Sequence, residues 1–187
     1  MKEKQIVEAA KRLFNKYGFK RVTMDEIAKE AGVTKRTVYA YFKSKEELFQ
    51  VIVNEELVNM KKIVEDVEKQ NSDFYEAVHQ GIYQLLIYIN KKRFLKNLVN
   101  EAEVLKNPVI VKNLKVLDEE VQNYIKQKLK IAVEKDKLKI RDIDITAFLI
   151  YKMYIALMFD WNENNKKLDE KDVADNIINF LKFGLCE

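Results

Sequence analysis

Residues Thr23–Lys45 read TMDEIAKEAGVTKRTVYAYFKSK, and they decide the fold because they hold two short helical patterns separated by a glycine. Thr23 and Glu26 are spaced as a capping box, which predicts a helix that begins directly after the threonine. Gly32 stands where a tight turn needs a positive φ, and Thr34 then caps a second short helix. Two helices joined in this way are typical of a helix-turn-helix.

The second helix opens with two cations, Lys35 and Arg36. The helix macrodipole and the unpaired N–H groups make that end positive, so cations there are electrostatically unfavourable. Their position makes sense mainly if an anion binds at this end. We therefore expect DNA phosphate to be the anion.

The helix-turn-helix pattern divides these residues into a core and an exposed face. The core is predicted to contain small and apolar side chains, namely Ile27, Ala28, Ala31, Val33, Val38 and Tyr41. The second helix is then free to enter a major groove, where Arg36 can donate two hydrogen bonds to guanine and Thr37 can meet a thymine methyl group. The predicted DNA contacts are Thr23, Thr34, Lys35, Arg36, Thr37, Tyr39, Tyr41 and Lys45.

Charge and composition agree with a small basic module on a neutral body. Residues 1–47 hold 12 Lys and Arg against 7 Asp and Glu, whereas residues 48–187 hold 22 against 23. With one Pro, four Gly and 48% hydrophobic residues, the chain is expected to be soluble and helical. The N-terminus has no apolar run of the kind a signal peptide needs, so we expect a cytoplasmic protein.

Apolar periodicity and capping residues predict an all-α fold in two domains. Residues 1–47 are the expected helix-turn-helix DNA-binding domain, and residues 48–187 the helical effector-binding and dimerisation domain. Gly18 is expected to end the first helix in a left-handed conformation. A second capping box at Ser44 opens a long helix that crosses from one domain into the other. The predicted helices are 3–17, 23–31, 34–42, 44–70, 72–90, 91–106, 108–135, 142–161 and 169–183.

The predicted helix over 142–161 is apolar on nearly every face, and the one over 169–183 carries a broad apolar stripe. A helix buried on one side only would be amphipathic, so the helix over 142–161 is expected to pack against something besides its own core. The simplest partner is a second copy of the chain, and the two helices of each copy would then form a four-helix bundle in a homodimer.

The stretch resembles the TetR family of transcriptional repressors, and the match covers about residues 1–50. Its members share T-x-x-x-I-A-x-x-A-G-V-[ST]-x-x-[TL]-[LIV]-Y-x-[YH]-F-x-[SN]-K-[ED]-x-L. This chain supplies Thr23, Ile27, Ala28, Ala31, Gly32, Val33, Thr34, Thr37, Val38, Tyr39, Tyr41, Phe42, Ser44, Lys45, Glu46 and Leu48. The resemblance implies an all-helical homodimer, DNA recognition by the helix over 34–42 and an effector pocket in the C-terminal domain. We expect such a dimer to bind a palindromic double-stranded DNA operator. Arg36 stands where the family often has Gly, and Ala40 where it often has His.

No cationic cluster indicates an anionic effector, and the aromatic content of the C-terminal domain favours a hydrophobic or aromatic one. The candidate effector-binding residues are His79, Tyr83, Tyr124, Tyr151, Tyr154, Met158 and Trp161, each of which has an alternative interpretation as an ordinary core residue. Gly81, in mid-helix, could leave room for a ligand or for a neighbouring backbone.

Enzymatic functions are poorly supported. Glu76 and His79 form a lone Glu-x-x-His, whereas a di-metal helical bundle needs two such pairs, and the chain has one His. No phosphate-binding glycine loop occurs. We expect no catalytic residue, no metal and no cofactor. An activator or effector-independent regulator of the same fold, or a helical adaptor that does not bind DNA, remains as an alternative.

Overall fold

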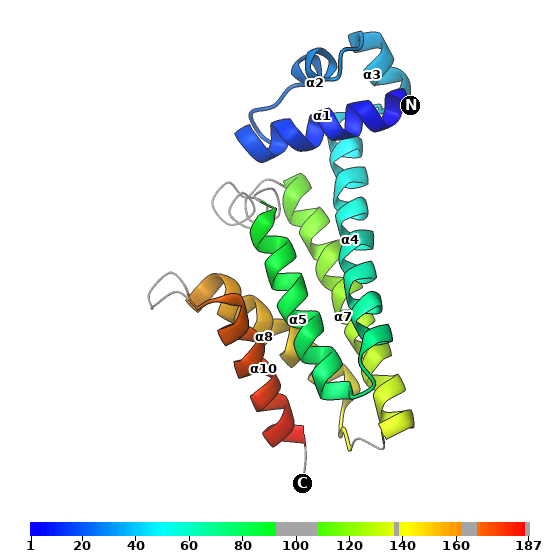
Figure 1. Cartoon of the computed structure of the whole chain (residues 1–187). Coiled ribbons are helices and arrows are strands. Elements are labelled where there is room, and N and C mark those ends of the chain that lie inside the picture. The colour runs from blue at the N-terminus through cyan, green and yellow to red at the C-terminus, as the bar shows by residue number, and fades with distance from the viewer. Residues whose placement is uncertain (93–107, 137–138, 162–167, 186–187) are drawn as a thin grey trace. The chain divides into compact units, whose positions relative to one another are not determined.

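The computed structural model describes residues 1–92, 108–136, 139–161 and 168–185, and all the regular elements in these ranges are helical (Figure 1). The elements are α1 (Lys2–Tyr17), α2 (Met24–Glu30), α3 (Lys35–Tyr41), α4 (Lys45–Gln70), α5 (Phe74–Lys91), α7 (Pro108–Asp136), α8 (Ile143–Ile155), a π-helix η1 (Ala156–Asp160) and α10 (Glu170–Leu185). The predicted all-α fold is confirmed. The helix expected over 91–106 falls almost entirely outside the described residues.

The chain forms two compact units, and α4, α5 and α7 each contribute residues to both. The first unit comprises Met1–Met60 and Ile89–Lys115, and the second comprises Lys61–Tyr88 and Val116–Glu187. The predicted boundary between residues 47 and 48 separates functions rather than compact units, and it stays a proposal.

The core of the first unit is built on three phenylalanines from α1, the loop that follows it and α4. The ring centroids of Phe14 and Phe19 lie 5.5 Å apart, and those of Phe19 and Phe49 lie 4.6 Å apart. All three side chains are buried. Gly18 makes this possible with φ 80° and ψ 160°, so the predicted left-handed cap is wrong in ψ. The extended ψ turns the chain so that Phe19 packs back on α1.

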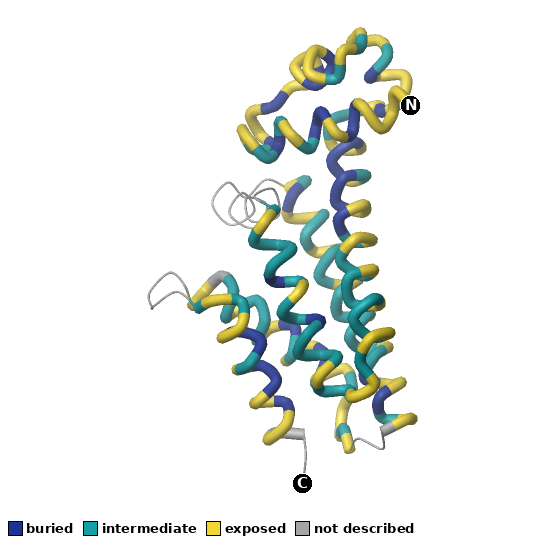
Figure 2. The backbone as a smooth tube through the Cα atoms, viewed as in Figure 1, coloured by how far each residue is buried: buried dark blue, intermediate teal, exposed yellow. Residues whose placement is uncertain are grey.

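The buried residues of α4 lie in the first half of the helix (Figure 2). Phe49 and Val53 are buried, whereas Val58 is 64% exposed. The buried positions follow a helical spacing that includes a charged residue, Glu56, which is 3% exposed. Apolarity alone could not identify this face, because its last member is a carboxylate.

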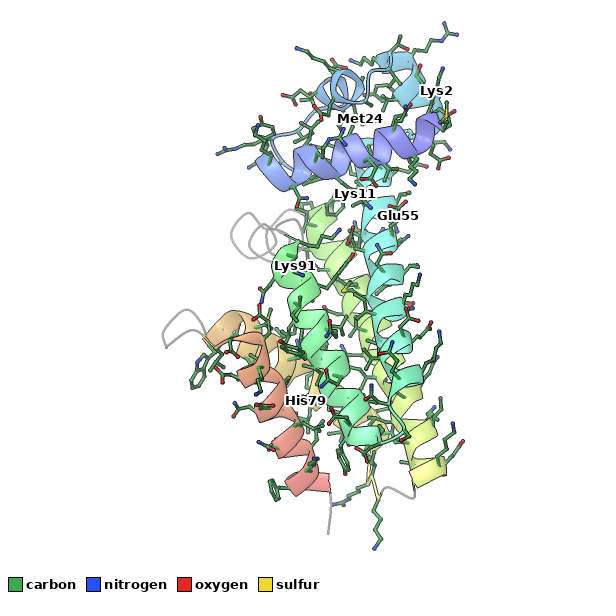
Figure 3. All side chains as sticks on the ribbon, viewed as in Figure 1. Lys2, Lys11, Met24, Glu55, His79 and Lys91 are labelled. Carbon is green, nitrogen blue, oxygen red and sulfur yellow. The ribbon has the colours of Figure 1, made fainter. Side chains whose placement is uncertain are left out.

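Two lysines surround the Glu56 carboxylate inside the first unit. Lys11 of α1 places its Nζ 3.4 Å from Glu56 Oε1 and 2.7 Å from Glu55 Oε2. Lys92, which follows α5, places its Nζ 3.8 Å from Glu56 Oε2. Burial opposes the charge of Lys11, but its hydrogen bond to Glu55 and the charges of both carboxylates outweigh that effect and raise its pKa. Figure 3 labels Lys11 and Glu55 among the side chains.

In the second unit, α5, α8 and α10 share an apolar core. Leu86 and the α10 residues Val173, Ile177, Ile178 and Leu181 are buried there. α10 begins at a reciprocal cap, in which Asp172 N–H donates to Asp169 Oδ1 at 2.7 Å and Asp169 N–H donates to Asp172 Oδ2 at 3.3 Å. The predicted start of this helix is confirmed, but the helix passes through Gly184 to Leu185 rather than ending at residue 183.

The helix predicted over 142–161 is not uniformly α-helical. Asp142 caps its start by accepting the Ile145 N–H at 2.9 Å, but α8 ends at Ile155 and a π-helix follows. The Trp161 N–H bonds to the Ala156 carbonyl five residues earlier, as a π turn requires. A stretch that is apolar on every face carries no periodicity from which this change of pitch could be detected. Among the residues the structure describes, no helix is both long and apolar enough to cross a membrane.

We predict that Glu56→Gln will lower the free energy of unfolding by about 2 kcal/mol, because it leaves Lys11 and Lys92 without their buried partner. Urea unfolding of the full chain measures the effect. The matched control is Glu55→Gln, whose side chain is 46% exposed and should cost less than about 1 kcal/mol. Equal effects of the two substitutions would show that Glu56 has no special structural role.

Candidate nucleic-acid interface

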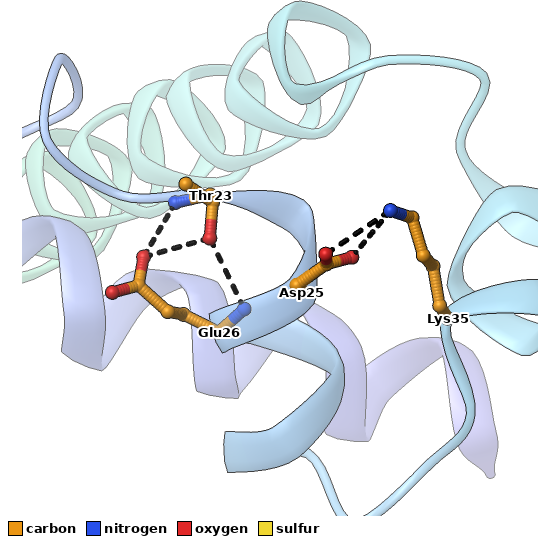
Figure 4. A network of polar contacts seen from close by, with 4 residues as sticks. All are labelled: Thr23, Asp25, Glu26 and Lys35. Carbon is orange, nitrogen blue, oxygen red and sulfur yellow. Dashed lines mark hydrogen bonds and ion pairs between the residues drawn. The ribbon is translucent and has the colours of Figure 1, made fainter.

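Both helices of the helix-turn-helix begin at side-chain caps. The Thr23 N–H donates to Glu26 Oε2 at 2.8 Å, and the Glu26 N–H donates to Thr23 Oγ1 at 3.3 Å, which confirms the predicted capping box (Figure 4). The Thr37 N–H donates to Thr34 Oγ1 at 3.2 Å, so Thr34 caps α3 as predicted. The hydrogen bonds from Thr23 hold the pKa of Glu26 below its ordinary value. The box therefore stabilises the folded state near neutral pH, and this contribution is lost as the pH falls through that lowered pKa.

The turn between α2 and α3 has the predicted glycine conformation. Gly32 has φ 66°, and an added Cβ would meet nothing within 4 Å, so the requirement for glycine here is conformational rather than steric. The Val33 N–H donates to the Ala28 carbonyl at 3.0 Å and closes the turn. Val38 and Ile27 are fully buried between the helices.

One predicted core residue of α3 is wrong. Tyr41 is 45% exposed, and Phe42, just after the end of the helix, is 3% exposed and occupies the core. Val38 and Phe42 are four residues apart and therefore lie on the same side of the chain. Tyr41 is thus exposed, which agrees with its other prediction, as a residue that contacts DNA.

The exposed face of α3 carries the residues predicted to meet DNA. Arg36, Tyr39 and Ala40 are exposed, with Tyr39 45% exposed, and Thr37 is half-buried. The hydroxyls of Thr34 and Thr37 lie 2.9 Å apart and share a hydrogen bond. Arg36 and Tyr39 therefore present their polar ends to solvent on one short helix, whereas the two threonines are engaged with each other.

Lys35 is paired within the protein, although its position at a helix start suggested an external anion. Its Nζ lies 2.8 Å from Asp25 Oδ1 and 3.0 Å from Asp25 Oδ2. Asp25 is the second residue of α2, so the pair spans the two helices of the motif (Figure 4). The hydrogen bond and the charge of Asp25 raise the pKa of Lys35. Sequence reasoning missed this partner because the two residues are ten positions apart and meet only through the turn.

Lys45, predicted to hold DNA phosphate, uses its ammonium group inside the domain. Its Nζ donates to the carbonyls of Phe19 and Val22 at 2.8 Å each, and lies 4.4 Å from the centroid of the Phe19 ring. The group therefore holds the loop between α1 and α2 against the start of α4.

The start of α4 has a modified capping box. The Glu47 N–H donates to Ser44 Oγ at 3.1 Å as predicted, but the Glu47 carboxylate accepts from the Lys43 N–H at 2.6 Å rather than from Ser44. The expected helix start is confirmed. The second hydrogen bond of the predicted box is wrong by one residue, because the donor to Glu47 is the N–H of Lys43 and not that of Ser44.

The predicted effector-binding residues differ in their surroundings. Tyr154 and Met158 pack against the apolar core of α5, α8 and α10. Tyr151 instead donates a hydrogen bond to Asp118 of α7, and Trp161 is 42% exposed. Tyr124 lies near Lys128, whose Nζ is 5.0 Å from its ring centroid.

Two further predicted positions lie on α5. His79 Nε2 lies 2.7 Å from Asp175 Oδ1 of α10, and Tyr83 is half-buried. A Cβ added to Gly81 would meet Val64 Cγ1 at 3.7 Å, which is an ordinary contact, so the glycine opens no large space at that point.

Burial raises the pKa of Tyr154, and burial together with Asp118 raises the pKa of Tyr151, so both phenols are neutral donors. The hydroxyl oxygen of Tyr154 is buried and has no hydrogen-bond partner among the described residues. Those residues also include no cluster of three or more His, Cys, Asp or Glu side chains that could hold a metal ion.

Comparison with known proteins decides the family. Residues 6–52 match the model of "Bacterial regulatory proteins, tetR family". The "Uncharacterized HTH-type transcriptional regulator YhgD" of Bacillus subtilis is 31% identical over 184 residues, which cover 98% of this chain and 96% of that protein. This chain belongs to the TetR family. It is a DNA-binding transcriptional regulator with an N-terminal helix-turn-helix domain joined by the long helix α4 to a helical C-terminal domain.

Solved structures of bacterial regulators have the same fold. A Clostridium perfringens putative fatty acid metabolism regulator is 26% identical, with a TM-score of 0.69 over 98% of this chain and 99% of that one. The Bacillus subtilis regulator FadR, solved in complex with stearoyl-CoA, is 20% identical, with a TM-score of 0.77 and the same coverage. At 20% identity, the similarity to FadR is evidence for the fold of this chain and not for its ligand.

We predict that Lys45→Met will lower the free energy of unfolding by about 2 kcal/mol, because two carbonyls lose their donor. Thermal or urea unfolding measures the loss. Lys43→Met is the control, since its side chain is exposed and should change stability by less than about 0.5 kcal/mol. A Lys45→Met variant as stable as the wild type would contradict the structural role of the ammonium group.

Proposed function

We propose that the chain is a homodimeric repressor that binds a palindromic operator through α3 and is released by a hydrophobic or aromatic effector bound in the C-terminal domain. The observation that supports the DNA contact most directly is the exposed face of α3, where Arg36 and Tyr39 extend from a helix whose opposite side is buried. Arg36 suits a bidentate contact with guanine, and Tyr39 suits a phosphate.

Homodimerisation through α8 and α10 is supported by the apolar side chains that these helices leave exposed. Ile145, Phe148 and Leu149 of α8 are 46% to 57% exposed, and Phe180 and Phe183 of α10 are 60% and 85% exposed. Large apolar groups gathered on two neighbouring helices mark an interaction surface. A second copy would bury them in the four-helix bundle expected from the sequence, and would space two recognition helices for the two half-sites of a palindrome.

The effector proposal is supported by the core of α5, α8 and α10. The Tyr154 hydroxyl lies within this apolar cluster without a partner among the described residues, and a buried donor left unsatisfied costs about 1–3 kcal/mol. An apolar effector with one hydrogen-bond acceptor would satisfy this group. FadR of B. subtilis was solved with stearoyl-CoA, whose acyl chain is apolar although its CoA group is anionic, so this neighbour supports only the apolar part of the proposed effector.

Release would follow from two states of the dimer. In the DNA-binding state, the recognition helices lie about one DNA turn apart, and the effector favours a state in which α4 has moved and this spacing is lost. The effector shifts the balance only by its difference in affinity for the two states.

An activator, or a regulator with a filled core and no effector, is the second candidate. A cytoplasmic location is proposed with this function, which requires neither enzymatic activity nor a cofactor.

Replacing both Lys35 and Arg36 by Ala should weaken operator binding at least tenfold and make its salt dependence shallower by about one to two released counterions. Fluorescence anisotropy of a labelled operator over a range of salt concentrations measures both quantities. The matched control removes two exposed lysines of α7, Lys130 and Lys135, and should change neither. Unchanged binding by the Lys35 and Arg36 variant would rule out α3 as the DNA-binding element.

A further inference from the structure

The ion pair between Asp25 and Lys35 is unusual because it lies on the proposed DNA-binding surface and yet contributes little to the fold. The ammonium group bridges both oxygens of the carboxylate, at 2.8 Å and 3.0 Å (Figure 4). The two side chains are 62% and 59% exposed. An ion pair this exposed contributes little to stability, so fold stability is a weak reason for its presence.

The backbone fixes the pair before any DNA arrives. Asp25 lies in the first turn of α2, which the Thr23 capping box holds, and Lys35 is the first residue of α3, which Thr34 caps. The turn at Gly32 sets the positions of the two helix starts. The carboxylate is therefore presented to the ammonium group by the folded motif itself.

We propose that Asp25 competes with DNA phosphate for Lys35 and thereby limits the affinity of the domain for DNA in general. This inference rests on the proposed DNA binding. A phosphate that approaches Lys35 must displace a carboxylate of the same charge, so the exchange replaces one anion by another and yields little free energy. The displaced Asp25 carboxylate is then left beside DNA of like charge, which opposes binding further.

The competition also changes the number of ions released. A lysine that neutralises a phosphate releases close to one condensed counterion from duplex DNA. If Asp25 gives up Lys35, however, the freed carboxylate attracts a cation from solution, and the net release is smaller. Lys35 thus contributes less to affinity and to salt dependence than a lysine with no carboxylate partner.

The test substitutes Asp25→Asn in the full chain and measures binding to a labelled duplex of random sequence over a range of salt concentrations. The variant should bind about three- to fivefold more tightly, and its salt dependence should be steeper by up to about one counterion. Asp25→Ser is a second variant with the same expected result, so that neither outcome depends on one replacement side chain.

Glu30→Gln is the matched control. Glu30 ends α2 and pairs with Arg12, whose Nε lies 2.9 Å away, and the two side chains are 40% and 58% exposed. This substitution removes the same negative charge from the same helix but leaves Lys35 paired. It should change binding much less than Asp25→Asn does.

Lys35→Ala provides the second control. In that background Asp25→Asn should tighten binding clearly less than it does in the wild type, because only the repulsion between Asp25 and DNA is removed and the contested cation is absent. The proposal is overturned if Asp25→Asn and Glu30→Gln tighten binding equally, if the effect of Asp25→Asn is undiminished in Lys35→Ala, or if the Asp25→Asn variant binds more weakly than the wild type. Failure of the wild type to bind any duplex would instead contradict the proposed function.

Discussion

The first unit depends on the burial of one carboxylate. Glu56 is 3% exposed and has Lys11 on one side and Lys92 on the other. A buried charge without a partner costs several kcal/mol, so the lysine of α1 and the lysine that follows α5 stabilise α4 in this position. The contact between Lys11 and Glu56 also holds α4, which leaves the DNA-binding domain, against α1 of that domain.

The polar groups of the helix-turn-helix divide into those that hold the fold and those left for DNA. Lys45 and Thr23 are used internally, one on loop carbonyls and one in a capping box. Arg36 and Tyr39 lie on the exposed face of α3. Lys35 belongs to both groups, because it is exposed and yet paired with Asp25. Counting basic residues therefore overstates the positive charge that this surface offers to phosphate.

Much of the DNA-binding domain could be predicted from its sequence, because its signals are local. The caps at Thr23 and Thr34 and the positive φ of Gly32 each follow from residues a few positions apart. The pairing of Asp25 with Lys35 could not be predicted in this way, since it depends on the angle at which two helices meet.

The C-terminal domain was less predictable because its signals are not local. Helix positions followed from apolar periodicity, but the π turn after Ile155 lies in a stretch without periodicity. The predicted effector residues illustrate the same limit. Tyr154 lies in an apolar core, Tyr151 bonds Asp118 and Trp161 is exposed, and nothing in their spacing distinguished these environments.

The central claim is that two copies of this chain read two half-sites through α3. Footprinting of the purified full chain on a genomic fragment that it retains tests this most directly. The account predicts two protected segments of inverted sequence whose centres lie about 10 base pairs, or slightly more, apart on the duplex. A single protected segment without two-fold symmetry, or uniform protection that follows no sequence, would contradict it.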